Sequence, residues 1–290
     1  MTTESVSIIL PAHNEAAVLG STLDAVFAQD YPGPMEVIVA ANGCDDETVD
    51  VAEHYRALAA AQDRELHVLD LPGRGKPGAL NAADAIASGD VRIYLDADVT
   101  ISGSAVSCVV GALQLDGIEF AAPAMLLNRP RSRVVRGYLT VWSRMPYVVD
   151  GDAGRGVYAV SAKGRSRWGS YPDLLSDDSF ARLHFESSEV AIVNDATVAV
   201  RFPETLREMI AVRGRLFRGI WELDERLPEL GTRHVQRGRV ALRTVARSPD
   251  LWLRAPAFLA IYVFGWLHAR RTLGREDAPW ARAESSRVRP

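Results

Sequence analysis

The first 95 residues alternate between short apolar runs and longer stretches in which apolar residues recur at helical spacing. The apolar runs predict four strands, at Val6–Leu10, Met35–Ala40, Leu66–Leu69 and Val91–Leu95. The amphipathic stretches between them predict three helices, at Glu15–Gln29, Asp45–Ala61 and Lys76–Ser88. Strands that alternate with helices over short connections predict an α/β fold whose Rossmann-like, mixed but mainly parallel sheet is flanked by helices.

Beyond residue 95 the pattern is less regular. It predicts helices at Ser104–Leu115 and Leu174–Phe185, and strand segments at Phe120–Leu127, Gly154–Val160 and Glu189–Val200. Residues 128–150 have a mixed helix or loop pattern, and the chain is Arg-rich and helical from Pro203 to about Arg247. We therefore expect a main domain at residues 1–205, an Arg-rich helical extension at 206–250, an apolar helix at 251–273 and a disordered polar tail at 274–290.

The apolar helix at 251–273 has three interpretations. Its uncharged stretch, Ala255–Leu267, has 13 residues, whereas a spanning helix needs about 20. Trp252, Tyr262 and Trp266 are residues that prefer the headgroup level of a bilayer. These features favour a helix that lies in a membrane interface, ahead of a helix that packs into the core and well ahead of a spanning one.

Composition and charge change this picture only in part. The 290 residues are 48% hydrophobic and 24% charged, which is typical of a globular protein. Residues 1–200 hold 15 Lys and Arg against 27 Asp and Glu, whereas residues 201–290 hold 18 Arg against 10 acids. The basic third favours an anionic surface as partner, although an Arg-rich composition with only two lysines also accounts for it.

Two cysteines without metal-type spacing, and an N-terminus without a basic and apolar leader, indicate a reduced, cytoplasmic setting.

The most informative chemistry lies at the end of the strand at Val91–Leu95. Asp96 and Asp98 follow it directly, and ligands of open α/β sheets bind outside the carboxyl ends of the strands. Two carboxylates one residue apart suit a hard divalent cation that in turn holds a phosphate. The alternative is an ordinary turn, since Asp is common where strands end.

Three further segments follow predicted strands. Pro11–Glu15 leaves the first strand and carries Asn14 and Glu15 to a helix start, and Asn42–Thr48 leaves the second strand. Gly73–Asn81 is a Gly-rich turn with one cation, Lys76, that opens a helix whose N–H groups attract phosphate. A Walker A loop is excluded because Pro77 follows the lysine, and no dinucleotide fingerprint follows the first strand.

Two segments beyond the predicted sheet complete the set. Ser176-Asp177-Asp178 places two adjacent carboxylates at a helix start, where they are either reactive groups or caps. Arg213–Gly219 carries Arg215 and Arg218 on a helix. Trp142, Trp168 and Tyr171 are candidates for stacking on a sugar or lining a lipid path, with core packing as the equal alternative.

These ordered segments together resemble the family 2 glycosyltransferases, inverting enzymes with the GT-A fold that use nucleotide-sugar donors. The resemblance runs from about Val6 to Gly219 and implies Asp98 as ligand of Mg²⁺ or Mn²⁺, Asp178 as general base and Asp177 as its orienting neighbour or substitute. It also implies a set of donor-binding residues: Pro11, Ala12, Asn14, Glu15, Asn42, Lys76, Asn81, Asp96, Arg215 and Arg218.

The chain departs from the family pattern at two places. Ala41 and Asn42 stand where the family usually has two acids, which puts recognition of uracil in question. Val212-x-x-Arg215-Leu216 stands where many relatives have Gln-x-x-Arg-Trp, which argues against a processive polysaccharide synthase.

The expected activity is therefore metal-dependent transfer of one sugar to an acceptor hydroxyl. Transfer to a polyprenyl phosphate at the inner face of the membrane is the runner-up, because the C-terminal third is basic and apolar. A nucleotidyltransferase and a binding module without activity are weaker alternatives. The expected partners are a nucleotide-sugar donor, a sugar or lipid-linked acceptor and an anionic membrane surface, and no nucleic acid.

Overall fold

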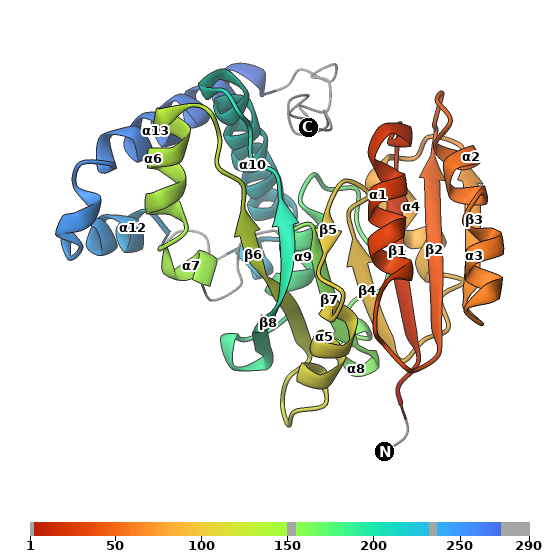
Figure 1. The fold of residues 1–290 in the computed structure, drawn as a ribbon. Helices are drawn as coiled ribbons and strands as arrows, with labels where there is room; N and C mark the ends of the chain where they lie inside the picture. Colours follow the sequence, from red (N-terminus) through yellow and green to blue (C-terminus); the bar gives the residue numbers. More distant parts are fainter. Residues whose placement is uncertain (1–2, 150–154, 232–236, 274–290) are drawn as a thin grey trace. The chain divides into compact units, whose positions relative to one another are not determined.

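The computed structural model describes residues 3–149, 155–231 and 237–273 (Figure 1). The chain forms two compact units. The first unit comprises Met1–Leu126, Gly154–Asp173 and His184–Val200, and the second comprises Leu127–Ala153, Leu174–Leu183 and Arg201–Pro290.

An eight-stranded mixed sheet forms the centre of the first unit, in the order β3-β2-β1-β4-β7-β6-β8-β5. Its strands are β1 (Val6–Ala12), β2 (Met35–Asn42), β3 (Glu65–Leu71), β4 (Val91–Leu95), β5 (Thr100–Ile101), β6 (Phe120–Leu127), β7 (Val157–Ser161) and β8 (Val190–Val200). β1 pairs in parallel with β2 and β4, and β2 with β3, so the carboxyl ends of four strands meet at one edge (Figure 1). The predicted α/β architecture is confirmed.

Helices cover the sheet because alternate residues of its strands point to opposite faces. Ile8 and Val37 join Leu19 and Leu23 of α1 (Ala16–Phe27) in one buried cluster. α4 (Gly75–Asp84) contacts β1 and β2, and Figure 1 shows it behind the sheet with α1 in front. The sheet is thus packed on both sides, as its nearly continuous apolar strands require.

The helix predicted at Asp45–Ala61 is two short helices, α2 (Thr48–Glu53) and α3 (Arg56–Ala61). The chain bends at Tyr55, whose hydroxyl oxygen lies within hydrogen-bond distance of two acceptors, the Gly20 carbonyl oxygen at 2.7 Å and Asp24 Oδ1 at 2.6 Å. A tertiary contact therefore overrides the local helical pattern.

The far half of the sheet is antiparallel, with β7 paired to both β4 and β6 and β5 paired to β8. The short strands expected at Glu189–Val200 are a single strand, β8. β5 and α8 (Ala162–Arg165) were not predicted, because segments of two and four residues carry no periodicity. The remaining elements of this unit are α5 (Ala105–Leu113) and a 3₁₀ turn, η1 (Ser187–Glu189).

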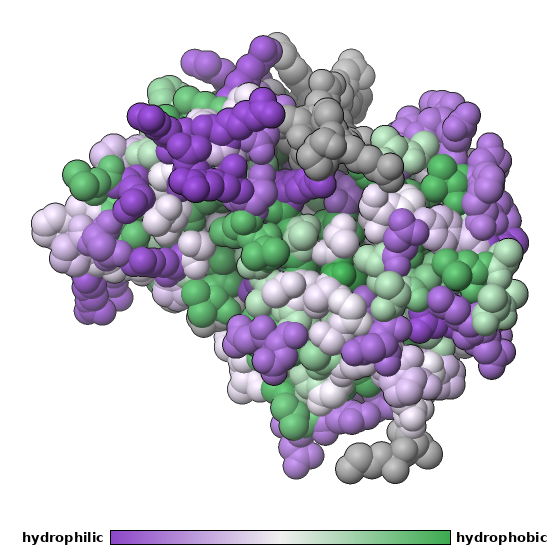
Figure 2. Space-filling model, in the orientation of Figure 1, coloured by the Kyte–Doolittle hydropathy of each residue, from purple (hydrophilic) through white to green (hydrophobic). Residues whose placement is uncertain are grey.

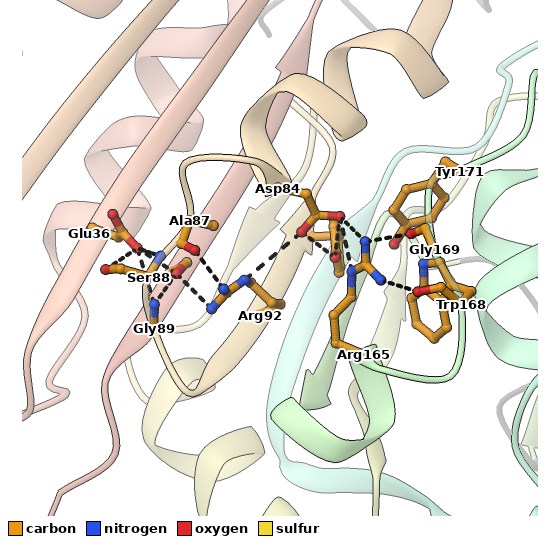
Figure 3. A network of polar contacts seen from close by, with 12 residues as sticks. Glu36, Asp84, Ala87, Ser88, Gly89, Arg92, Arg165, Trp168, Gly169 and Tyr171 are labelled. Carbon is orange, nitrogen blue, oxygen red and sulfur yellow. Dashed lines mark hydrogen bonds and ion pairs between the residues drawn. The ribbon is translucent and has the colours of Figure 1, made fainter.

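A polar network braces the first unit near the amino-terminal ends of its central strands (Figure 3). Glu36 Oε1 accepts hydrogen bonds from the Ser7 hydroxyl at 2.6 Å, from Ser88 and from the Gly89 amide. These bonds outweigh the cost of burial, which by itself raises the pKa, and hold the pKa of Glu36 below its usual value.

The same network continues to Asp84, which accepts from Arg165 at 2.9 Å and lies 3.9 Å from Arg92 (Figure 3). Arg165 also donates to the carbonyl oxygens of Trp168 and Gly169, at 2.7 and 2.9 Å. The segment that leads to Tyr171 is thereby tied to the end of α4.

The second unit is helical over its described residues. Its elements are α6 (Arg133–Trp142), α7 (Pro146–Val149), α9 (Asp177–Leu183), α10 (Leu206–Arg226), α11 (Pro228–Gly231), α12 (Arg237–Ala246), η2 (Pro249–Leu251) and α13 (Ala255–Thr272). α10 and α13 pack closely at Gly214 and Gly265, where a Cβ on Gly265 would lie 2.7 Å from the Cβ of Arg213. No helix of the described ranges is both long and apolar enough to cross a membrane.

Candidate functional site

The exits of β1 and β2 are joined by hydrogen bonds between their loops. Asn14 adopts a left-handed conformation, with φ of 52°, and its Oδ1 accepts from the Asp45 amide at 2.8 Å. Thr48 accepts from the Glu15 amide at 2.8 Å, and Asp46 accepts from the Ala16 amide at 3.1 Å. Local strain at Asn14 is therefore held by several bonds, which keeps the turn before α1 in one shape.

Asn42 fastens the end of β2 to the Gly-rich turn before α4. Its Oδ1 accepts from the Arg74 amide at 2.9 Å, and its Nδ2 donates to the Gly75 carbonyl oxygen at 2.8 Å. Gly43, with φ of 62°, allows the close approach, since a Cβ there would lie 2.7 Å from Gly73 Cα. The Asn42 amide thus shapes the turn that carries Lys76.

The two carboxylates that follow β4 differ in their surroundings. Asp96 is half-buried, and its Oδ1 accepts from Lys76 Nζ at 2.7 Å. Asp98 is exposed. The buried Thr22 hydroxyl, which lies 2.8 Å from the Ala97 carbonyl oxygen and 3.0 Å from that of Val99, fixes the turn between them. Lys76 and Asp96 therefore meet at the carboxyl edge of the sheet, and Asp98 follows two residues further along the chain.

Gly156, at the start of β7, completes this corner. Its carbonyl oxygen accepts from the Asp96 amide at 2.7 Å. With φ of 71°, it leaves no space for a side chain, because a Cβ would lie 2.7 Å from Val99 Cγ1 and 3.3 Å from Asp96 Oδ2. Asp96 is therefore held by its backbone as well as by Lys76.

Arg155 is a functional candidate that the sequence analysis did not identify. It precedes Gly156, is only 5% exposed, and desolvation by burial lowers its pKa to about 10. Arginine is the residue that binds phosphate oxygens most specifically, and Arg155 directly precedes Gly156, whose carbonyl oxygen is bonded to the Asp96 amide. No motif marks it, because its position depends on β7 pairing antiparallel to β4.

The Asp96 and Asp98 carboxylates fit a metal ion of the Mg²⁺ or Mn²⁺ type. Such ions use one or two protein carboxylates and complete their shell with water and phosphate oxygens. Within the described residues, the only group of three potential metal ligands is Glu36, Glu65 and His67. That group lies near the amino-terminal ends of β2 and β3, the opposite edge of the sheet, so it is not the predicted metal site.

Asn81 is hydrogen-bonded to the backbone of Tyr171, and the candidate aromatic residues are buried. Asn81 Oδ1 accepts from the Tyr171 amide at 2.7 Å and Nδ2 donates to the Tyr171 carbonyl oxygen at 2.9 Å. Trp168 and Tyr171 are buried and pack edge-to-face, and Trp142 is buried against Phe202 in the second unit. Of the two interpretations left open for these aromatic residues, the structure shows core packing.

The acidic pair lies in the second unit, at the start of α9. Asp177 is buried, whereas Asp178 is half-buried. The segment before it is fixed on α10, because the Leu175 amide donates to Glu222 Oε2 at 3.0 Å. Gly219 of α10 makes room for it, since a Cβ there would lie 2.1 Å from Ser176 Oγ. The more accessible carboxylate of the pair is thus Asp178.

Arg215 and Arg218 are half-buried on the same helix, α10. Arg218 Nε is buried and, within the residues that the structure describes, has no hydrogen-bond partner. Arg213 instead stacks on aromatic rings, 5.1 Å from the Phe217 centroid and 5.7 Å from that of Tyr262. Packing between α10 and α13 therefore occupies Arg213.

Comparison with known proteins finds a family model that matches about the first half of the chain. The model of the glycosyl transferase family 2 matches residues 7–148. Two relatives are glycosyltransferase AglD of Haloferax volcanii, 34% identical over 45% of this chain and 22% of that protein, and the probable glycosyltransferase YdaM of Bacillus subtilis, 36% identical over 38% and 27%. These matches span less than a third of either relative.

Two solved structures share the fold at low identity. A mannosyltransferase from Pyrobaculum calidifontis, PcManGT, in complex with GDP-Man and Mn²⁺, has a TM-score of 0.65 and 18% identity, covering 92% of this chain and 86% of that one. TarS of S. aureus, residues 1–349 in complex with UDP-GlcNAc, has a TM-score of 0.56 and 14% identity, covering 92% of each chain. The GT-A architecture implied by the motifs is confirmed.

Proposed function

Residues 7–148 match glycosyl transferase family 2, and from this premise we propose that the chain transfers a single sugar from a nucleotide-sugar donor to an acceptor hydroxyl with inversion. The observation that carries the proposal is the contact between Lys76 and Asp96 beyond the parallel strands, with the exposed Asp98 two residues further along the chain. Two structural neighbours in complex with such donors, GDP-Man and UDP-GlcNAc, support it.

In this proposal the donor nucleotide lies along the exits of β1 and β2. Pro11, Ala12, Asn14 and Glu15 form one wall, and Asp96 bonds to the ribose or the sugar. Asn42 and Asn81 would act indirectly, without contacting the donor. Asn42 holds the turn that carries Lys76, and Asn81 holds the segment at Tyr171.

The diphosphate is proposed to lie at the start of α4. Backbone N–H groups at a helix N-terminus favour anions, and Lys76 adds its charge once the donor competes for it with Asp96. Arg215 and Arg218 are proposed as further phosphate ligands. Asp98 would hold Mg²⁺ or Mn²⁺, which when bound neutralises charge on the departing nucleoside diphosphate. The Mn²⁺ in the PcManGT complex supports this assignment.

We assign the general base to Asp178. The acceptor oxygen forms a bond to the anomeric carbon on the face opposite the diphosphate, and the bond from that carbon to the phosphate oxygen breaks. Its electron pair leaves with the nucleoside diphosphate, and the hydroxyl proton passes to a carboxylate oxygen of Asp178. The partial exposure of Asp178, beside the buried Asp177, supports this choice.

A polyprenyl phosphate is the second candidate acceptor. A specific observation favours it: one face of α13 is apolar and exposed, with Leu259 57% accessible. An enzyme with such an acceptor would work as a peripheral protein at the inner, cytoplasmic face of a membrane. A nucleotidyltransferase is not favoured, since the loop after β1 lacks the glycines that such an enzyme uses.

A thermal-shift screen tests donor binding. We expect UDP-, GDP- or dTDP-sugars to raise the melting temperature with Mn²⁺ and much less without it, because a ligand stabilises by RT ln(1 + [L]/Kd). Asp98→Asn should retain the unliganded melting temperature and lose the Mn²⁺-dependent part of the shift. If Asp98→Asn responds to donor and Mn²⁺ as the unmodified protein does, the metal assignment is wrong.

A further inference from the structure

The two faces of α13 have different surroundings. Phe258, Ile261 and Ala269 are buried, and they share one face of the helix with Gly265. Phe258 stacks on Tyr138 of α6 with ring centroids 5.5 Å apart. This face packs on α6 and α10 within the second unit. Half of the helix is therefore core, as the core-packing interpretation expected.

The opposite face is apolar but exposed. Leu259 is 57% accessible and Phe264 54%, and Val263 is exposed beside them. Just before the helix, Leu253 is 94% and Trp252 58% accessible. Soluble monomers rarely expose large apolar side chains in a contiguous group, and such groups mark interaction surfaces. We call these five residues the α13 surface.

Positive charge surrounds the α13 surface. Between residues 240 and 273 the chain has five arginines, all exposed, and a single acid, Asp250, which is paired with Arg144. Arg254 precedes the apolar stretch, and Arg270 and Arg271 follow it. Arg270 stacks on Trp266, 4.0 Å from the ring centroid. Figure 2 shows green apolar atoms beside purple polar chains over the part of the molecule that holds α12 and α13 in Figure 1.

Exposed apolar side chains surrounded by arginines indicate one kind of binding partner for the α13 surface. An apolar strip flanked by arginines matches the interface of an anionic bilayer, where the strip enters the acyl boundary and guanidinium groups remain at the phosphates. A second copy of the chain, docked through the same face, would bring its own arginines against these, and residues 240–273 hold only one acid, Asp250, to oppose them. Charge therefore disfavours self-association through this face.

We propose that the α13 surface docks the protein on an anionic lipid bilayer, with α13 lying in the plane of the interface. The buried face of α13 stays packed on α6 and α10, so binding needs no unfolding. The proposal does not depend on sugar transfer, and vesicle binding can be measured without donor or acceptor.

Flotation with liposomes tests the proposal on the full chain. We expect retention by vesicles of phosphatidylglycerol and phosphatidylcholine, weaker retention as salt is raised, and little on phosphatidylcholine alone. The double variant Leu259→Gln with Val263→Gln should lower vesicle affinity by more than about tenfold. Arg271→Gln should lower it by roughly fivefold.

Leu115→Gln is the matched control, because Leu115 is a similarly exposed leucine in the first unit. It should bind vesicles as the unmodified protein does, and all variants should keep their melting temperature, since only exposed side chains change. Substitution is used instead of removing α13 because its other face is core. Failure of the intact chain to float, or equal losses in Leu115→Gln, overturns the proposal. A concentration-dependent dimer that the double variant abolishes would overturn it in favour of a second copy.

Discussion

At the scale of single residues, Lys76 and Asp96 show how the donor corner is kept ready. Two carboxylates close to one another repel, and Lys76, 2.7 Å from Asp96, offsets this charge. A bound donor diphosphate would attract Lys76, and its cation would attract the carboxylates. The contact between Lys76 and Asp96 would then be replaced by contacts with the donor and the cation. The Lys76 side chain is only 20% exposed, so its interaction with Asp96 is less screened by solvent than that of a surface pair.

Asp178→Asn is predicted to keep donor binding and to lower turnover by at least ~10²-fold, the usual contribution of a general base. The matched control is Asp177→Asn at the neighbouring, buried position. Initial rates with saturating donor, together with donor affinity by calorimetry, check this. A larger loss in Asp177→Asn would exchange the two roles, and small equal losses would show that both acids only cap α9.

At the scale of elements, α10 packs against both α13 and the turn at Ser176. Gly214 allows the close approach of α13, and one and a half turns later Gly219 allows the approach of the Ser176 turn. The acidic pair is therefore positioned by a helix whose other contacts are with α13.

Gly219→Ala is predicted to lower turnover, by up to about 10²-fold, because the added Cβ would lie 2.1 Å from Ser176 Oγ and 3.3 Å from Ser176 Cβ, which crowds the turn that carries Asp178. Donor affinity should change little. Gly111→Ala in α5 is the matched control, since a Cβ there meets nothing within 4 Å and Ala favours the helix by about 1 kcal/mol. Equal turnover in the two variants would contradict a positioning role for Gly219.

At the scale of the whole molecule, the parallel half of the sheet was predictable and the antiparallel half only in part. β1, β2 and β4 have apolar runs buried on both faces, which local pattern reveals. That β7 inserts between β4 and β6 depends on pairing between distant segments. Local motifs were enough to identify Asp96 and Lys76 as candidates. Arg155 could be identified only from the structure, because its position depends on the pairing of β7 with β4. The apolar helix illustrates a further limit, since periodicity could not show that one face is core and the other exposed.

The most direct test of inverting transfer is the stereochemistry of donor breakdown. UDP-GlcNAc and GDP-mannose, both α-linked at the anomeric carbon, are incubated with the protein and Mn²⁺, and proton NMR follows the released sugar before it mutarotates. Direct displacement by water in place of the acceptor predicts that the β-anomer appears first, and that Asp178→Asn slows its release. First appearance of the α-anomer from either donor would contradict the proposed inverting mechanism.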